Sequence, residues 1–364
     1  MKVGLVLGAG GVMGGAWLTG GLHALAQETG WDSASADHVV GTSAGSMISA
    51  LLTGGVPPWF MVAHSAGESF DGITDAQQRP AAGADRSGGA VFKLHPGIAL
   101  PGPGSWRLIA NGLRDPRRHR PAALAAGWLP RGLVSTQPLQ DTVRRVVPSG
   151  WADHPHLWIV ACDYVQGRRV AFGREDAPTC DLAEAVAASC AIPGFYRPVK
   201  IAGRRYVDGG VWSGSNLDIL RHGLDLVICL NPTSSLDAGA SRGAASGISA
   251  RLRSQAGRRL GWEARRLRDA GTDVVLIQPT AVDIEAMGPN LMSRRNRNSV
   301  IETAIATVGD QLRGGAHGDL LAGLPAGEPH RIARPSEPPS EWPDGLPPGR
   351  ADPAVPSGQT ATRA

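Results

Sequence analysis

The sequence GTSAGS occupies residues 41–46, between the apolar run DHVV and the helix-like run MISALLTGG. A serine between two glycines, placed where a strand turns into a helix, is typical of a tight turn that exposes the hydroxyl, and the flanking glycines avoid side-chain clashes. The N-terminus of the following helix also favours negative charge nearby. A serine at this place is also a common helix N-cap. The stretch therefore predicts a nucleophilic Ser43 framed by Gly41 and Gly45, with ordinary capping as the alternative.

The surrounding sequence alternates between strand-like and helix-like patterns. VGLVL (3–7) and HVV (38–40) are short apolar runs typical of buried strands, and helical patterns follow them near 12–27 and 44–53. Further strands and helices are predicted at 157–164, 168–173, 181–190, 192–212, 226–230 and 274–278. This alternation indicates an α/β fold with a mostly parallel central sheet.

Two regions depart from the alternation. Residues 66–130 lose both periods and are rich in Gly, Pro and Arg, which predicts an inserted cap or lid region. Near the C-terminus, ten of the 28 prolines fall between residues 325 and 356. Such a segment buries too little apolar surface to offset the entropy of ordering it. We therefore expect one domain at 1–313, which includes the insertion, and a disordered tail at 314–364.

Composition narrows the class of protein only in part. A chain of 364 residues with 42% apolar content can bury one large core. Its formal charge of +4 is spread over many arginines and gives no indication of a nucleic-acid partner. The cysteines form no CxxC pair and are too few for a disulfide framework, which favours a reducing, cytoplasmic compartment. They are Cys162, Cys180, Cys190 and Cys229.

Residues 3–27 contain no Asp, Glu, Lys or Arg, a feature shared with leaders and membrane anchors. Eight of these 25 residues are glycine, however. A membrane span would be richer in large apolar side chains. The segment therefore favours a buried strand, a Gly-rich turn and an amphipathic helix, with a leader as the alternative.

The Gly-rich turn LGAGGVMGG (7–15) lies between the first predicted strand and the first helix. Its backbone N–H groups can converge on an anion, either a bound phosphate or a developing oxyanion. A dinucleotide site needs GxGxxG, but Met13 stands where the third glycine belongs.

A third feature, YVDGGV (206–211), ends a predicted strand in Asp208, Gly209 and Gly210. Taken alone, that feature is also a common hairpin turn.

Together these motifs resemble the patatin-like phospholipase family. That family is similar in having a Gly-rich oxyanion turn, a GxSxG nucleophile elbow, an A-S-x-A-x-P-G-x-F segment and a later DGG or DGA. Here these stand as GAGGVMG, GTSAG, ASCAIPGFYRPV (188–199) and DGG. The resemblance implies a three-layer α/β/α sandwich that hydrolyses lipid acyl esters without a cofactor or metal. It implies a dyad of Ser43 and Asp208, and an oxyanion hole of backbone amides at Gly10, Gly11 and Val12.

Two residues can suffice for this chemistry, because a carboxylate that accepts the serine proton activates the hydroxyl for attack. The sequence departs from the family at Met13, where Arg or Lys is usual. This departure puts in doubt the rigidity of the turn and the recognition of an anionic head group, so a more general lipid esterase stays open. Pro193, Gly194 and Phe195 are expected to shape the segment that leads to Asp208.

Two other function classes also stay open. A conventional Ser-His-Asp hydrolase needs a histidine after its acid, and only His222, His317 and His330 follow Asp208. A nucleotide- or phosphate-binding module, or a lipid sensor without turnover, would use the same Gly-rich turn. The sequence leaves the oligomeric state undetermined.

The lipid substrate that the resemblance implies must reach Ser43 from the surface of the protein. The insertion at 66–130, with Trp106, Leu108 and Leu113, is expected to cover the acyl pocket as a lid.

A helical pattern at 251–268 places Leu252, Leu260 and Leu267 on one side and most arginines opposite. Packing of the leucines on the sheet is favoured, and transient contact with a membrane surface is the alternative.

Overall fold

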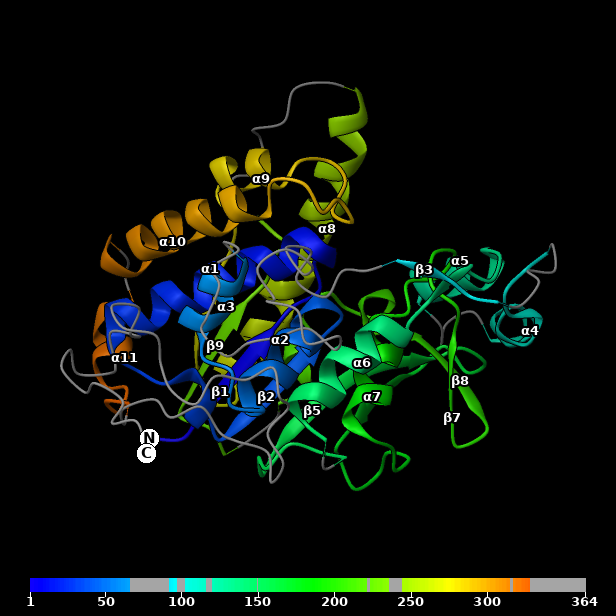
Figure 1. Ribbon diagram of the computed structural model, residues 1–364, viewed down its shortest axis with the longest axis horizontal. Coiled ribbons are helices and arrows are strands. Elements are labelled where there is room, and N and C mark those ends of the chain that lie inside the picture. Colours follow the sequence, from blue (N-terminus) through cyan, green and yellow to red (C-terminus); the bar gives the residue numbers. More distant parts are fainter. Residues whose placement is uncertain are drawn as a thin grey trace, which may run out of the picture.

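The computed structural model describes residues 1–65, 92–96, 102–115, 120–148, 150–220, 223–235, 244–314 and 317–327. A central sheet of eight strands crosses the molecule (Figure 1). The strands are β1 (Val3–Leu7), β2 (His38–Thr42), β5 (Leu157–Asp163), β6 (Arg169–Phe172), β7 (Val199–Ile201), β8 (Arg204–Asp208), β9 (Leu226–Leu230) and β10 (Asp273–Ile277).

The strand order is β10-β9-β1-β2-β5-β8-β7, with β6 also beside β5. The five strands from β10 to β5 are parallel to one another, whereas β6, β7 and β8 pair antiparallel. The parallel strands are almost wholly apolar and buried because helices cover both faces of this part of the sheet. The expected α/β fold with a mostly parallel sheet is confirmed.

The helices form the two outer layers. They are α1 (Gly11–Thr29), α2 (Ala44–Thr53), α3 (Pro58–Ser65), α6 (Gln137–Val146), α7 (Leu182–Ser189), α8 (Ala244–Arg268), α9 (Ala281–Met287), α10 (Arg297–Gly314) and α11 (Gly318–Ala322). One face of the sheet packs against α1, α2 and α7, and the opposite face packs against α8. These layers make the three-layer α/β/α sandwich that the sequence predicted.

Helix α1 lies between the sheet and α10. A side chain added at Gly21 would meet Leu230 of β9, and one added at Gly20 would meet Ile301 and Ala304 of α10. Twelve of its 19 residues are buried, so the helix is enclosed on several sides rather than amphipathic. This enclosure explains the uncharged N-terminal segment, because residues 3–26 of β1, the turn after it and α1 lie largely within the core.

Among the described residues, no single helix is long and apolar enough to cross a bilayer. Helices α2 and α3 reach that length only as a pair, with a bend of 118° between them.

The predicted insertion contributes β3 (Lys93–Leu94), α4 (Trp106–Arg114) and α5 (Pro121–Trp128), and β3 pairs with β4 (Val134–Ser135). These elements lie at one end of the molecule, on the right in Figure 1. The other residues of the insertion, including 66–91, lie outside the described residues.

At the C-terminal side, the ordered chain extends beyond residue 313. Helix α11 follows α10, and Leu321 and Leu324 are buried in the main core. The rest of the predicted tail, 328–364, lies outside the described residues.

Candidate active site

The site lies at the carboxyl edge of the parallel strands. Strands β1 and β2 are adjacent and parallel, so the turn after β1 and the turn after β2 lie side by side. Strand β5 separates β2 from β8 and aligns their ends, because Thr42 pairs with Val160 and Asp208 pairs with Ala161. This register brings Ser43 and Asp208 together although 165 residues separate them. The Ser43 Oγ donates a hydrogen bond of 2.6 Å to Asp208 Oδ2, and both side chains are buried.

Ser43 sits on a strained turn. Its φ of 53° and ψ of −119° lie in a region that side-chain-bearing residues rarely adopt. The two glycines are required sterically: a Cβ at Gly41 would lie 2.6 Å from the Ser46 Cα, and one at Gly45 would overlap the Leu7 carbonyl oxygen. The Ser43 hydroxyl makes no capping bond to α2 and points to Asp208 instead. Ordinary capping was therefore the wrong interpretation of this serine.

Asp208 is held by the two glycines that follow it. The Gly210 N–H donates to Asp208 Oδ1 at 2.7 Å, and a side chain at Gly209 would overlap the Val160 carbonyl oxygen. Burial raises the pKa of Asp208 to about 6, although the hydrogen bonds from Ser43 and Gly210 act to lower it. A carboxylate with this pKa is ionised at neutral pH and is a better proton acceptor than an exposed aspartate.

The Gly-rich turn after β1 leaves three backbone N–H groups available. The neighbouring N–H groups are used: Ala9 donates to Gly214 and Met13 donates to Leu291. Those of Gly10, Gly11 and Val12 have no acceptor among the described residues. These three N–H groups are the ones predicted to form the oxyanion hole.

Only part of the turn faces the cavity beside Ser43. Gly11 and Val12 line this cavity, whereas Gly10 does not. Gly11 has a φ of +61°, and a Cβ there would lie 2.8 Å from the Leu291 carbonyl oxygen. The Met13 side chain is buried in the core, so this position presents no side chain to a head group.

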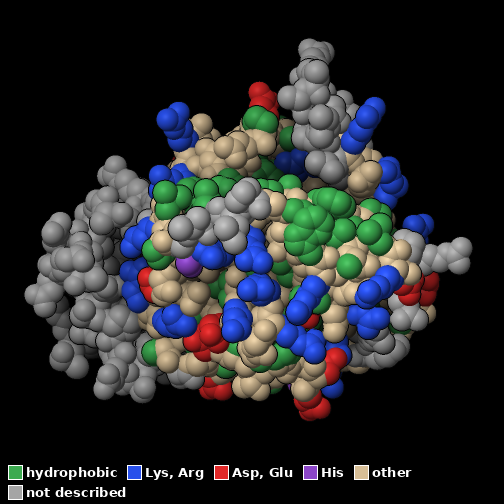
Figure 2. All heavy atoms as spheres, turned by 90° about the vertical axis from the view of Figure 1, so that its right-hand side faces the viewer, with side chains coloured by type: hydrophobic (Ala, Val, Ile, Leu, Met, Phe, Trp, Pro, Cys, Tyr) green, Lys and Arg blue, Asp and Glu red, His purple; other side chains and the backbone are tan. Residues whose placement is uncertain are grey.

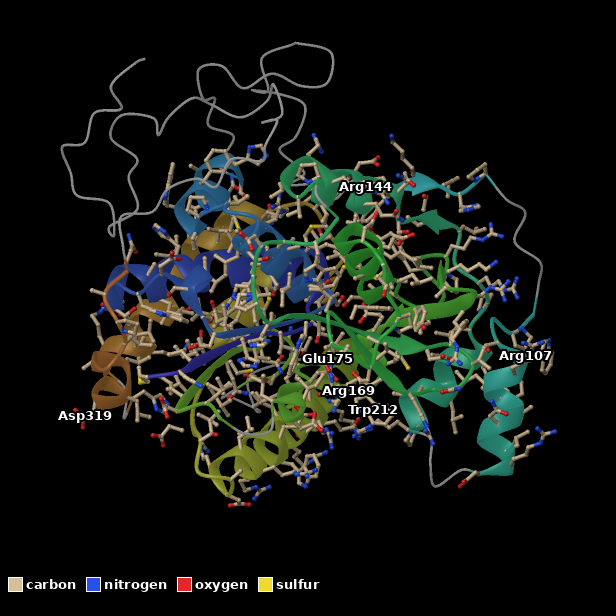
Figure 3. The ribbon with its side chains drawn as sticks, turned by 90° about the horizontal axis from the view of Figure 1, so that it is seen from below. Arg107, Arg144, Arg169, Glu175, Trp212 and Asp319 are labelled. Carbon is tan, nitrogen blue, oxygen red and sulfur yellow. The ribbon has the colours of Figure 1, made fainter. Side chains whose placement is uncertain are left out.

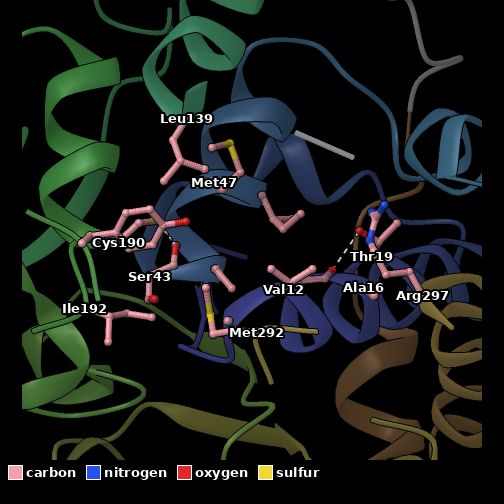
Figure 4. Close-up of a pocket in the computed structure, with 15 residues that line it drawn as sticks. Val12, Ala16, Thr19, Ser43, Met47, Leu139, Cys190, Ile192, Met292 and Arg297 are labelled. Carbon is pink, nitrogen blue, oxygen red and sulfur yellow. Dashed lines mark hydrogen bonds between the residues drawn. The ribbon is translucent and has the colours of Figure 1, made fainter. Parts of the chain in front are cut away.

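The cavity has a volume of about 110 Å³ and runs along one side of α1. Figure 4 shows Ser43 at one end and Thr19 and Arg297 at the other. Its walls are mostly apolar and are formed by Gly11, Val12, Gly15, Ala16, Thr19, Ser43, Ala44, Met47, Ile48, Leu139, Cys190, Ile192, Tyr196, Met292 and Arg297. A narrow apolar cavity with one reactive hydroxyl suits a slender acyl chain.

No described residue of the insertion lines this cavity. Leu108 instead packs with Tyr164 and Val207, while Trp106 and Leu113 are exposed. These three side chains therefore do not line the cavity, and a lid formed by the insertion, part of which lies outside the described residues, stays a prediction. Helix α4 packs on the face of β5 and β8 opposite to α7: Leu108 clusters with Cys162 and Val207, whereas Ala161 and Tyr206 belong to the core on the α7 side.

Comparison with known proteins identifies the family of this chain. The family model for patatin-like phospholipases matches residues 5–221, which is more than half of the chain. The chain belongs to the patatin-like phospholipase family. No curated protein is similar enough to count as a match. The crystal structure of VipD from Legionella pneumophila is similar with a TM-score of 0.38 and 13% sequence identity, over 84% of this chain and 67% of that chain.

Two residues that sequence reasoning missed hold the patatin-like motifs together. The Ser189 Oγ accepts the Ser43 N–H at 2.8 Å and donates to the Val160 carbonyl oxygen at 2.6 Å. Asn216 is buried, and its Nδ2 contacts Thr42 Oγ1 at 3.1 Å and the Gly209 carbonyl oxygen at 3.5 Å. Ser189 lies within the quoted ASCAIPG block, so the motif contained its signal, whereas Asn216 had none.

The remaining candidates lie away from this site or have other roles. His222, on which a conventional triad would depend, lies outside the described residues. The cysteines are free, and burial raises the pKa of the Cys190 thiol to about 12, so this residue is a packing group. Among the described residues, no group of three or more His, Cys, Asp or Glu side chains is arranged to hold a metal.

Proposed function

We propose that this chain hydrolyses acyl esters of lipids through an acyl-Ser43 intermediate, with Asp208 as the general base. The observation that carries the proposal is the 2.6 Å hydrogen bond from the Ser43 hydroxyl to a buried carboxylate, at the end of an apolar cavity. Membership of the patatin-like phospholipase family supports the same reaction class.

In the first half of the reaction, the Ser43 Oγ attacks the ester carbonyl carbon and its proton passes to Asp208 Oδ2. The carbonyl oxygen becomes an oxyanion and accepts hydrogen bonds from the free N–H groups of Gly11 and Val12, with Gly10 beside them. Collapse of the tetrahedral intermediate breaks the ester bond. Asp208 then returns the proton to the departing alkoxide, which leaves as an alcohol.

In the second half, a water molecule attacks the acyl-Ser43 carbonyl and gives its proton to Asp208. The same amides stabilise the second oxyanion, and collapse releases the carboxylic acid while the proton returns to Ser43 Oγ. Each step uses one carboxylate in both directions, so no histidine is needed.

The apolar cavity is the proposed site for the acyl chain. It follows α1 from Gly11 to Thr19, and eight residues of helix span about 12 Å. Met47, Ile48, Leu139 and Met292 form apolar walls, which would remove the chain from water. The alcohol part of the ester would leave on the side of Ser43 opposite to Arg297.

The proposal is tested with a fluorophosphonate probe and with p-nitrophenyl esters. We expect the probe to label Ser43 alone, and Ser43→Ala to lose both labelling and at least about 10⁴-fold in kcat, as in other serine hydrolases that lose their nucleophile. Ser49→Ala is the matched control, because Ser49 lies on the same helix and its buried hydroxyl has no hydrogen-bond partner among the described residues.

Labelling of a different serine, or ester hydrolysis that survives in Ser43→Ala, would reject the dyad. If neither labelling nor hydrolysis occurs in the folded wild-type protein, a lipid-sensing role without turnover becomes the better proposal.

A further inference from the structure

The end of the molecule built by α4, α5 and the adjoining chain exposes an unusual amount of apolar surface. Nine large apolar side chains are exposed among the described residues, and six of them lie between residues 92 and 136. The six are Leu94, Trp106, Leu113, Trp128, Leu129 and Leu133. Figure 2 shows this end of the molecule, where hydrophobic side chains gather with Lys and Arg around them. A large exposed apolar patch on a globular fold indicates an interaction site.

Helix α4 has apolar residues on two sides. Leu108, Ile109 and Gly112 face the protein, and Leu108 packs against Tyr164 and Val207.

On its solvent side, Trp106, Ala110 and Leu113 follow the spacing i, i+4, i+7 and therefore form one stripe. Trp106 and Leu113 are 64% and 79% exposed, and Trp106 contacts Trp128 of α5 edge to face at 6.2 Å. We call Trp106, Ala110, Leu113, Trp128 and Leu129 the cap face.

The charge of this region is strongly positive. Residues 92–136 contain seven Lys or Arg and one Asp, a net charge of +6, whereas the whole chain carries only +4. Arg107 and Arg114 lie beside the apolar stripe on α4 and are exposed. Figure 3 shows Arg107 at the end of the molecule opposite Asp319 of α11. An apolar surface bordered by arginines complements a surface that is both apolar and anionic.

A second cavity opens next to the cap face. It has a volume of about 300 Å³, and its walls include Trp106, Tyr164 and the three arginines Arg107, Arg131 and Arg205. Among the residues that the structure describes, none that lines this cavity carries a carboxylate. Guanidinium groups bind phosphate through paired N–H donors, so the cavity suits a phosphate group.

We propose that the cap face docks on an anionic phospholipid bilayer. Trp106, Leu113 and Trp128 would enter the boundary between head groups and acyl chains, where tryptophan is favoured. A head-group phosphate would occupy the cavity between Arg107, Arg131 and Arg205. No described residue of the cap face lines the cavity beside Ser43, so docking does not depend on the proposed hydrolysis.

The alternative membrane contact, through α8, has less support. Leu260 and Leu267 are buried against the sheet, which confirms the packing interpretation for these two leucines. The exposed side of α8 offers Trp262, over which Arg259 and Arg266 stack at 4.2 and 4.9 Å. This tryptophan is already covered by cations of its own helix.

The test measures co-sedimentation of Ser43→Ala protein with vesicles, so that no lipid is consumed. We expect binding to phosphatidylcholine vesicles that contain phosphatidylserine, little binding to phosphatidylcholine alone, and release at high salt. Changing Arg107, Arg131 and Arg205 together to Gln should weaken binding on the order of 100-fold, because each basic residue near such a surface contributes about 1 kcal/mol. Trp106→Ser with Trp128→Ser should weaken it at least about tenfold.

Matched changes on α8 control for total charge and aromatic content. The triple variant Arg258→Gln, Arg265→Gln, Arg266→Gln and the single variant Trp262→Ser should bind as tightly as the parent, and melting temperatures check that every variant is folded. Equal binding to neutral and anionic vesicles, or weakening by the α8 changes alone, would overturn the proposal. A parent protein that sediments with neither vesicle would also overturn it, and would leave the cap face to a protein partner.

Discussion

Two cavities in the described part of the chain are built in different ways. The one beside Ser43 has about 110 Å³ and mostly apolar walls, and Ser43 in its wall directly follows the buried strand β2. The one beside α4 has about 300 Å³, three arginines in its wall and exposed tryptophans beside it. The first depends on backbone positions that cannot move without disturbing the sheet, whereas the second depends on side chains at the surface. We infer that ester hydrolysis takes place in the cavity beside Ser43 and that contact with an anionic surface takes place beside α4.

Asp208→Asn should give the largest effect and should affect only the first region. Asparagine has the shape of aspartate, but it cannot take the proton of Ser43. We expect kcat/KM to fall by about 10⁴-fold on a p-nitrophenyl ester and on a phospholipid alike, as when the acid of a serine triad becomes an amide. Vesicle binding should not change. Activity within tenfold of wild type would show that another group is the base.

The difference in melting temperature between Asp208→Asn and wild type should depend on pH. The pKa of folded Asp208 is about 6, above its ordinary value of 3.8, so folding favours the protonated form. The stabilising contribution of protonated Asp208 is fully present below pH 3.8 and is lost as the pH rises through 6. Above pH 6 the free energy of unfolding is therefore lower by about 3 kcal/mol. Asp208→Asn should therefore melt higher than wild type at pH 8 and gain little at pH 4.

Wild-type kcat/KM should rise through the same pH region as Asp208 ionises. A difference in melting temperature that does not vary with pH would contradict the raised pKa.

Ser189→Ala should have an intermediate effect. Ser189 accepts the Ser43 N–H and donates to the Val160 carbonyl oxygen, and alanine removes both of these buried hydrogen bonds. A buried N–H group left without an acceptor, here that of Ser43, costs about 1–3 kcal/mol. We expect the strained turn to lose its fixed geometry, so that fluorophosphonate labelling slows by about 10–100-fold.

Cys190→Ala is the control for this experiment, because Cys190 offers the Ser43 carbonyl oxygen only a weak S–H donor at 3.2 Å. If Ser189→Ala labels as fast as Cys190→Ala, the turn does not need the Ser189 hydroxyl.

The two regions also differ in how far the sequence predicts them. Strand β1 and helix α2 have the predicted bounds because short apolar runs, bounded by glycine, determine them. Ser43 directly follows β2 and Asp208 ends β8, each within a glycine motif, so a local sequence pattern identifies both residues. Ser189 and Asn216 act through contacts with residues 146 and 174 positions away, which no local pattern encodes.

The insertion shows a second limit. Helix α4 carries two apolar sides, one with Leu108 and Ile109 and one with Trp106 and Leu113. Periodicity identifies both but cannot decide which one is buried, because that depends on the surface offered by β5 and β8. For this reason the sequence alone could not place Trp106 and Leu113 relative to the cavity beside Ser43.

The smallest expected effect tests whether the cavity beside Ser43 is apolar to its far end. Arg297 lies there, and its Nη2 donates to Ser65 Oγ at 3.2 Å. Arg297→Met removes the charge and leaves a flexible apolar side chain, so two further methylene groups of an acyl chain could be buried at about 0.8 kcal/mol each. The ratio of kcat/KM for longer over shorter p-nitrophenyl esters should rise up to about tenfold, whereas exposed Arg295→Met should leave it unchanged. An unaltered ratio in Arg297→Met would mean that acyl chains stop short of this residue and that its guanidinium serves the contact between α10 and α3.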